Sequence, residues 1–85
     1  MQVREINTVE EFESLKRGDM LLIEWSDEFV KHHPKSKKID LYTIFKVSLN
    51  DHEVICRMKG NHYFNYNLYL DNKSCAVKVL RVLKE

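Results

Sequence analysis

The sequence predicts a mainly β fold in which a short N-terminal helix is followed by a five-stranded antiparallel small barrel. Three observations lead to this prediction. Apolar side chains recur at helical spacing over residues 9–15. From residue 39 onward, apolar and polar residues alternate with a period of two, which is typical of half-buried strands. Short turn sequences separate the alternating segments, so consecutive strands should be antiparallel neighbours.

A capping box starts the predicted helix. The Thr8 hydroxyl can accept a hydrogen bond from the amide of Glu11, and the Glu11 carboxylate can reach back to the amide of Thr8. The apolar residues at helical spacing are Val9, Phe12 and Leu15. Gly18 can adopt the left-handed conformation that ends many helices. These signals predict a helix over residues 9–16, which is too short to be stable unless it packs on the strands.

The predicted strands follow from alternation and from turn residues. A first strand covers residues 20–25, and residues 26–38 form a long loop because they show no periodicity and contain a proline and four lysines. Alternation then predicts strands over residues 39–49, 54–59, 63–70 and 75–83, with turns at 50–51, 60–61 and 71–72. Five such strands curled around one core would form a barrel that hides its edges.

This element order resembles that of the SH3-like and Sm-like small barrels, the second of which also begins with a helix before five strands. The resemblance covers the whole chain but lies in element order alone. The Asp-x-x-Met-Asn turn of Sm proteins is missing, and too much chain follows residues 57–61 for them to be the second Sm motif. An OB-type barrel fits less well because its helix would lie in the middle of the chain.

Length and composition predict one small domain over residues 1–85. A hydrophobic content of 44% and a net charge of +1 argue against disorder. Residues 1–13 are acidic and lack the apolar run of a secretory signal, and no apolar stretch approaches the roughly 20 residues that span a bilayer. We therefore expect no membrane association and a cytoplasmic location.

The segment from residue 29 to residue 38 is the most unusual part of the sequence. It contains four lysines and two histidines and no acid, whereas residues 1–29 carry a net charge of −5. This contrast argues against a protein wrapped in nucleic acid but permits one basic face. Long loops of this kind are either functional or simply solvated and mobile. On the functional interpretation, an anion or phosphate would contact Phe29, Lys31, His32, His33, Lys35, Lys37 and Lys38.

The predicted strand over residues 63–70 provides a second candidate surface. If its apolar residues face inward, two tyrosines and two amides share the outer face: Tyr63, Asn65, Asn67 and Tyr69. Such a face could stack on and hydrogen-bond a base or a peptide. The alternative is that tyrosine is present because it favours strands in general.

Metal binding and catalysis find little support. On an extended strand His52 and Cys56 would lie about 13 Å apart, too far to share one zinc ion. Cys56 and Cys75 lie in apolar runs and are expected to be reduced core thiols. Neither is part of a recognisable nucleophile and base pair. We expect no cofactor, no metal and no enzymatic activity.

The sequence therefore favours a non-catalytic binding module that meets a protein partner through residues 29–38 and the Tyr63/Tyr69 face. By analogy, plain domains of this size are common among bacterial and phage accessory proteins, including inhibitors that act by occlusion. One alternative is a nucleic-acid binder that uses Lys31, Lys35, Lys37 and Lys38. Another is a binder of a small, nucleotide-like ligand. We expect a homodimer, because small domains gain stability from association.

Overall fold

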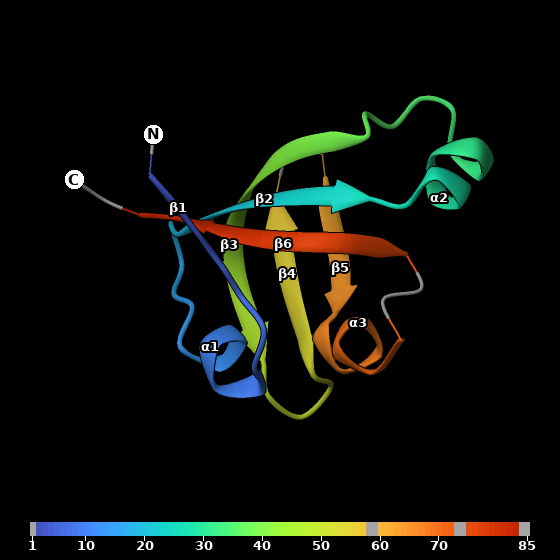
Figure 1. The fold of residues 1–85 in the computed structure, drawn as a ribbon. Coiled ribbons are helices and arrows are strands. Elements are labelled where there is room, and N and C mark those ends of the chain that lie inside the picture. The colour runs from blue at the N-terminus through green and yellow to red at the C-terminus, as the bar shows by residue number, and fades with distance from the viewer. Residues whose placement is uncertain (1, 58–59, 73–74, 84–85) are drawn as a thin grey trace.

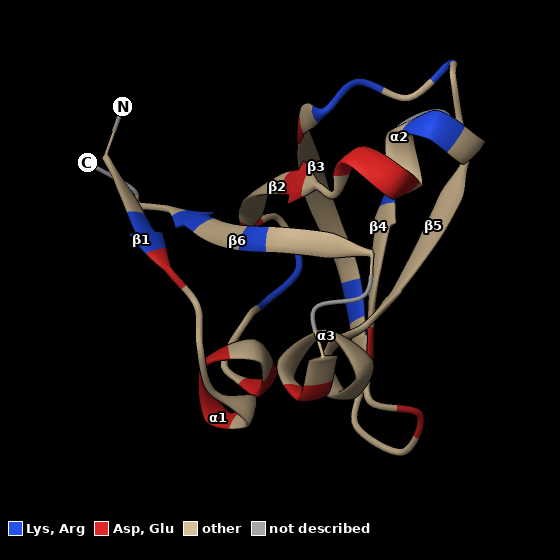
Figure 2. Ribbon diagram, turned by 45° about the vertical axis from the view of Figure 1, so that its right-hand side comes forward, with Lys and Arg blue, Asp and Glu red and all other residues tan. Residues whose placement is uncertain are grey.

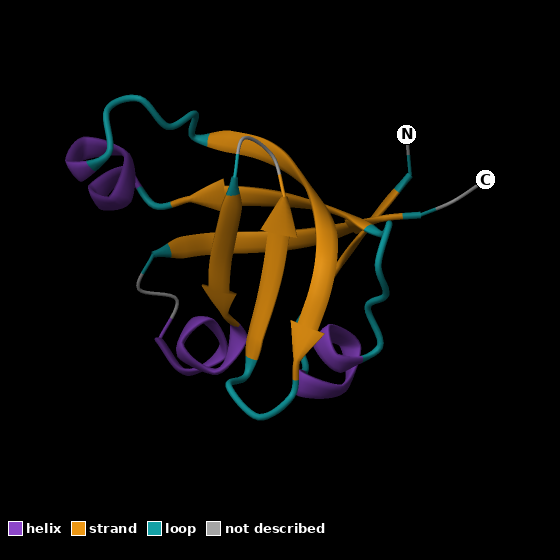
Figure 3. Cartoon of the chain, turned by 180° about the vertical axis from the view of Figure 1, so that it is seen from behind, coloured by secondary structure: helices purple, strands orange, loops and turns teal. Residues whose placement is uncertain are grey.

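One antiparallel sheet of six strands, together with three short helices, makes up the part of the chain that the computed structural model describes, which is residues 2–57, 60–72 and 75–83. Figure 1 and Figure 3 show this curved sheet from opposite sides. In chain order the elements are β1 (Val3–Glu5), α1 (Val9–Glu13), β2 (Met20–Trp25), α2 (Asp27–His32), β3 (Ile39–Ser48), β4 (Glu53–Arg57), β5 (Asn61–Asn65), α3 (Tyr66–Asn72) and β6 (Ala76–Val82).

The strands follow the order β1-β6-β2-β3-β4-β5 across the sheet. Strands β2 to β5 are consecutive antiparallel neighbours, with short connections from β3 to β4 and from β4 to β5 and a longer one, which contains α2, from β2 to β3. The last strand, β6, instead lies between β1 and β2, with Val82 opposite Val3 and Leu80 opposite Leu22. The first and last strands are therefore side by side (Figure 1).

The predicted five-stranded barrel is not confirmed. The sheet has an additional strand, and over the described residues its two outer strands, β1 and β5, pair only with β6 and β4. The sheet is thus curved but open. The predicted element order is also not confirmed, because β1 precedes the first helix. The sequence did not predict β1, because its three residues show no clear alternation of apolar and polar side chains.

The capping signal before α1 is confirmed in part. The Glu11 amide donates to the Thr8 hydroxyl oxygen at 3.2 Å, as expected of an N-cap. The Glu11 carboxylate accepts from the amide of Asn7 at 3.2 Å and from the Thr8 hydroxyl at 3.1 Å. The Asn7 hydrogen bond is the main cause that lowers the pKa of Glu11. Helix α1 ends at Glu13, earlier than the predicted residue 16.

Strand β3 confirms the predicted alternation but changes face part-way along. Tyr42 and Ile44 are buried, and a register shift between Ile44 and Lys46 then brings Val47 against the core. Such a bulge adds one residue to the strand and bends it. Phe45 lies at the bulge with the guanidinium groups of Arg57 and Arg17 over its ring, at 3.7 and 4.8 Å from the ring centroid.

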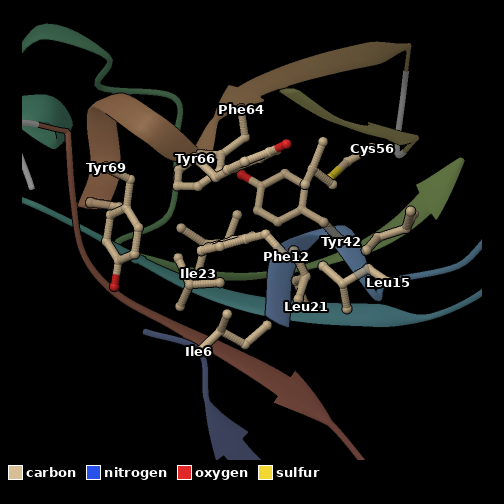
Figure 4. Close-up of a cluster of buried hydrophobic side chains, with 14 residues drawn as sticks. Ile6, Phe12, Leu15, Leu21, Ile23, Tyr42, Cys56, Phe64, Tyr66 and Tyr69 are labelled. Atoms are coloured by element: carbon tan, nitrogen blue, oxygen red, sulfur yellow. The ribbon is translucent and has the colours of Figure 1, made fainter. Parts of the chain in front are cut away.

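An aromatic cluster around Phe12 forms the centre of the core (Figure 4). The Phe12 ring stacks on Tyr66 at a centroid distance of 5.3 Å and meets Tyr69 edge-on at 5.9 Å. Phe64 lies 6.2 Å away. These contacts join α1 to α3, and the two helices lie side by side beneath the sheet in Figure 1.

The predicted strand over residues 63–70 is wrong in its second half. The chain leaves β5 at Asn65 and forms α3, with the Asn65 side-chain oxygen accepting from the Leu68 amide at 3.0 Å. Helical spacing points Tyr66 and Tyr69 toward the same neighbour, Phe12. The predicted turn at residues 71–72 is accordingly the last turn of α3.

The predicted loop over residues 26–38 is also wrong in part, because α2 occupies residues 27–32. Ser26 caps this helix, its hydroxyl oxygen accepting from the Phe29 amide at 3.1 Å. Acidic residues lie in the first turn and basic residues in the last, which complements the helix dipole. In Figure 2 the blue ribbon that marks Lys and Arg appears at the end of α2 and again in the segment that leads to β3.

Candidate functional site

A cavity of about 530 Å³ opens between α2, β5, α3 and the start of β6. Its volume falls within the range of roughly 300 to 1,000 Å³ that is common for ligand pockets. Most of the side chains in its wall are apolar or aromatic. The described residues that line it are Ile23, Trp25, Phe29, His33, Ser36, Tyr42, Cys56, His62, Tyr63, Phe64, Asn65, Leu68, Tyr69, Cys75 and Ala76.

A stack of three rings forms the α2 side of the cavity. Trp25 packs on Phe29 with centroids 4.3 Å apart, and Phe29 packs on His33 at 4.2 Å. Phe29 and His33 lie four residues apart, so one helical turn places them on the same side of α2. Trp25 reaches the stack from the end of β2, where the register of β2 against β6 shifts.

Strand β5 and, on the far side of β4, part of β3 form the opposite side. Phe64 meets Trp25 edge-on at 6.0 Å, and His62 meets Tyr42 at 5.8 Å. Tyr63 is 61% exposed at the rim. Since β5 is an outer strand, this wall of the cavity is also an edge of the sheet.

Few polar groups interrupt the aromatic wall. The Trp25 indole N–H donates to the Tyr42 hydroxyl oxygen at 3.2 Å. Burial raises the pKa of the Tyr42 phenol, so the group is neutral and available as a donor. His33 Nδ1 lies 3.0 Å from the Phe29 carbonyl oxygen, which can only accept, so Nδ1 carries the proton and Nε2 is left for other partners.

The cavity collects several of the residues expected from the sequence to bind a partner. Its wall includes Phe29, His33, Tyr63, Asn65 and Tyr69. Six others lie outside its wall: Lys31, His32, Lys35, Lys37, Lys38 and Asn67. The prediction that Tyr63 and Tyr69 both face outward is wrong, because Tyr69 is 3% exposed and belongs to the core.

One lysine of residues 29–38 is paired with an acid from outside that segment. Lys38 Nζ lies 2.8 Å from an Asp27 carboxylate oxygen at the start of α2. Their hydrogen bond is the main cause that raises the pKa of Lys38 and lowers that of Asp27. Both side chains are exposed, so solvent screens this pair. Lys35 and Lys37 flank Ser36, which lines the cavity.

Sequence reasoning missed Trp25, Tyr42, His62 and Leu68 as cavity residues. Two features of the sequence could have indicated the ring stack. Trp25, Phe29 and His33 follow one another at intervals of four residues, and Ser26, directly after Trp25, is a suitable helix N-cap. No comparable signal marks Tyr42 or His62, because strands that are distant in the sequence bring them to the same wall.

Comparison with protein-family models, with curated proteins and with solved structures finds no match to this chain. Over the residues that the structure places, no three or more metal-ligating side chains gather as they would around an ion. No helix in that part of the chain has the length and apolar character needed to cross a membrane. The functional argument therefore depends on the geometry of the cavity.

The two cysteines in the cavity wall are expected to differ strongly in reactivity. Neither forms a disulfide, and the expectation that both are core thiols is wrong for Cys75, which is exposed. Cys56 is 1% exposed, and burial raises its pKa to about 11. At pH 8 we expect Ellman's reagent to modify Cys75 at least about 100-fold faster than Cys56 in the native protein.

The control variants for this labelling are conservative. Cys75→Ser should remove the fast phase, whereas Cys56→Ser should retain it, and urea should release the second thiol of the wild type. Equal rates for both thiols in the native protein would contradict the burial of Cys56.

Proposed function

We propose that this protein is a non-catalytic binding module that holds a flat aromatic group of its ligand in the cavity between α2 and β5. The observation that carries the proposal is the aromatic lining of this cavity, with few polar groups converging on it. Ligand sites commonly combine an apolar lining with a small number of placed polar groups. Aromatic side chains favour other rings through stacked and edge-on contacts.

The chemistry of the wall supports binding more than catalysis. The Cys56 thiol is protonated at neutral pH because its pKa is raised to about 11, and a thiol in that state is a poor nucleophile. The Nδ1 atom of His33 is held by the Phe29 carbonyl oxygen. The Trp25 indole N–H is hydrogen-bonded to the Tyr42 hydroxyl oxygen. These groups suit recognition of a ring and of one or two polar atoms on it.

The test uses Trp25, which is the only tryptophan of the chain and lines the cavity. We expect its fluorescence to change on titration with indole, phenol or adenine at millimolar concentration, and the melting temperature to rise. Leu68→Ala should weaken binding by about 3- to 10-fold, because the ligand loses an apolar neighbour at the rim.

Leu49→Ala is the matched control for Leu68→Ala. Leu49 and Leu68 are 56% and 57% exposed, but only Leu68 lines the cavity. The control should bind like the wild type. A folded protein that responds to none of the three probes, or equal effects of the two leucine variants, would refute the proposed site.

A further inference from the structure

We infer that the ligand is an aromatic anion, a flat ring that carries a phosphate or carboxylate group. The ring occupies the aromatic cavity, and the anionic group lies at its His33 end, beside Lys35 and Lys37. This inference rests on the proposed function, because it names the ligand class of the same cavity.

The ring stack determines what the cavity offers to a ligand. Phe29 is covered on one face by Trp25 and on the other by His33, both nearly parallel to it, at 17° and 15°. Phe29 can therefore present only its edge to the cavity. Ring edges carry the positive part of the aromatic quadrupole, so they favour the face of an electron-rich ring or an anionic oxygen.

The cavity wall has no negative charge to repel an anion. None of the described residues that line it is Asp, Glu, Lys or Arg. Acids do lie outside the wall: Asp27 pairs with Lys38 at 2.8 Å, and Asp40 acts electrostatically on Tyr42. Glu28 follows Asp27 in the first turn of α2, at the opposite end of this helix from His33.

Two lysines adjoin the cavity wall in the chain, near its His33 end. The Ser36 amide donates to the His33 carbonyl oxygen at 2.9 Å, and this turn keeps Ser36 in the cavity wall. Lys35 and Lys37 adjoin Ser36 in the chain, which puts two cationic residues next to a residue of the cavity wall. Hydrogen bonds from ammonium groups to phosphate or carboxylate are stronger than those between neutral groups.

His33 adds a directional contact at the same end. Its Nδ1 is engaged by the Phe29 carbonyl oxygen at 3.0 Å, so Nε2 is the ring nitrogen that can meet a ligand. When Nε2 also carries a proton, it donates to an anionic oxygen. The aromatic wall, the imidazole and the two lysines together match a ring joined to an anion better than they match a neutral ring.

The experiment compares neutral and anionic forms of the same ring by Trp25 fluorescence and calorimetry at low salt. One pair is adenosine and AMP, and the other is indole-3-acetamide and indole-3-acetate. In at least one pair, we expect the anion to bind about 10-fold more tightly than the neutral compound. This ratio of affinities, the anion advantage, should fall as added salt screens the charges. The pair that shows the larger advantage distinguishes a nucleotide from an aromatic carboxylate.

Matched variants locate the anionic group. The double variant Lys35→Ala/Lys37→Ala should reduce the ratio of anion affinity to neutral-ring affinity by about 3-fold or more while leaving the binding of adenosine or indole-3-acetamide unchanged. His33→Ala should lower the same ratio by a similar factor. His32→Ala and Lys46→Ala should have no effect, because both exposed residues lie outside the cavity wall.

The outcomes separate this inference from the proposed function. Equal affinity for the neutral and anionic member of both pairs would overturn the inference and leave the aromatic site standing. No binding of any of the four compounds would overturn both. Binding of a single-stranded oligonucleotide without binding of AMP or indole-3-acetate would also overturn the inference, in favour of a nucleic-acid surface.

Discussion

Replacing Phe12 with alanine is expected to lower the free energy of unfolding by about 3–5 kcal/mol. Phe12 is fully buried and contacts the rings of Tyr66, Tyr69 and Phe64. The loss combines the transfer energy of the ring with the cavity that it leaves. Small domains lie near the lower end of the usual range of about 5–15 kcal/mol, so this substitution should remove a large part of the stability. Urea titration followed by circular dichroism measures the effect.

Phe45→Ala is the control for this core substitution. Phe45 lies at the β3 bulge, is only half-buried and is covered by guanidinium groups instead of core side chains. We expect Phe45→Ala to cost clearly less than Phe12→Ala, and Phe12→Leu to fall between the two. A Phe12→Ala variant as stable as Phe45→Ala would show that α1 does not pack on α3 as described.

Replacing Asp19 with alanine should lower the free energy of unfolding by about 2–3 kcal/mol. Asp19 is 7% exposed, accepts from the Lys16 amide at 2.8 Å and pairs with Arg81 at 3.2 Å. The substitution removes a charged acceptor and leaves the Lys16 amide and a partly buried guanidinium without it. The measurement is again urea denaturation, with a double-mutant cycle of Asp19→Ala and Arg81→Met to isolate the pair.

Asp27→Ala is the matched control for Asp19→Ala. Asp27 also lies close to a cation, Lys38, but both side chains are exposed to solvent. Exposed pairs contribute little to stability, so this variant should unfold like the wild type. If Asp19→Ala and Asp27→Ala lowered the free energy of unfolding equally, this would contradict the buried contacts of Asp19 with Lys16 and with Arg81 of β6.

Local signals predicted well where the sequence allowed one interpretation. The Thr8 cap, the strand at residues 20–25 and the alternation of β3 all depend on neighbours within a few residues. Residues 63–70 allowed two interpretations, since their apolar side chains fit a period of two while Tyr66, Tyr69 and Leu70 also fit a helix. The helix is favoured because Tyr66 stacks on Phe12, which lies more than fifty residues earlier in the chain.

The open sheet and the cavity could not be predicted for a related reason. Strand β1 has three exposed residues and exists because β6 pairs with it, a pairing between opposite ends of the described chain. The cavity needs residues from β2, α2, β5, α3 and β6 at once. Candidate residues such as Phe29, His33 and Tyr63 could be identified from composition, but their common location depends on long-range pairing.

The position of β6 has a consequence for the order of folding. Strands β2 to β5 can assemble through neighbouring hairpins, but the free side of β2 is covered only by the strand that comes last in this sequence. Until residues 76–82 are in place, β2 presents an uncovered row of amides and carbonyls beside the apolar side chains of Leu21 and Ile23. Uncovered edges of this kind recruit strands from other chains, so this protein is most vulnerable to aggregation just before its folding is complete.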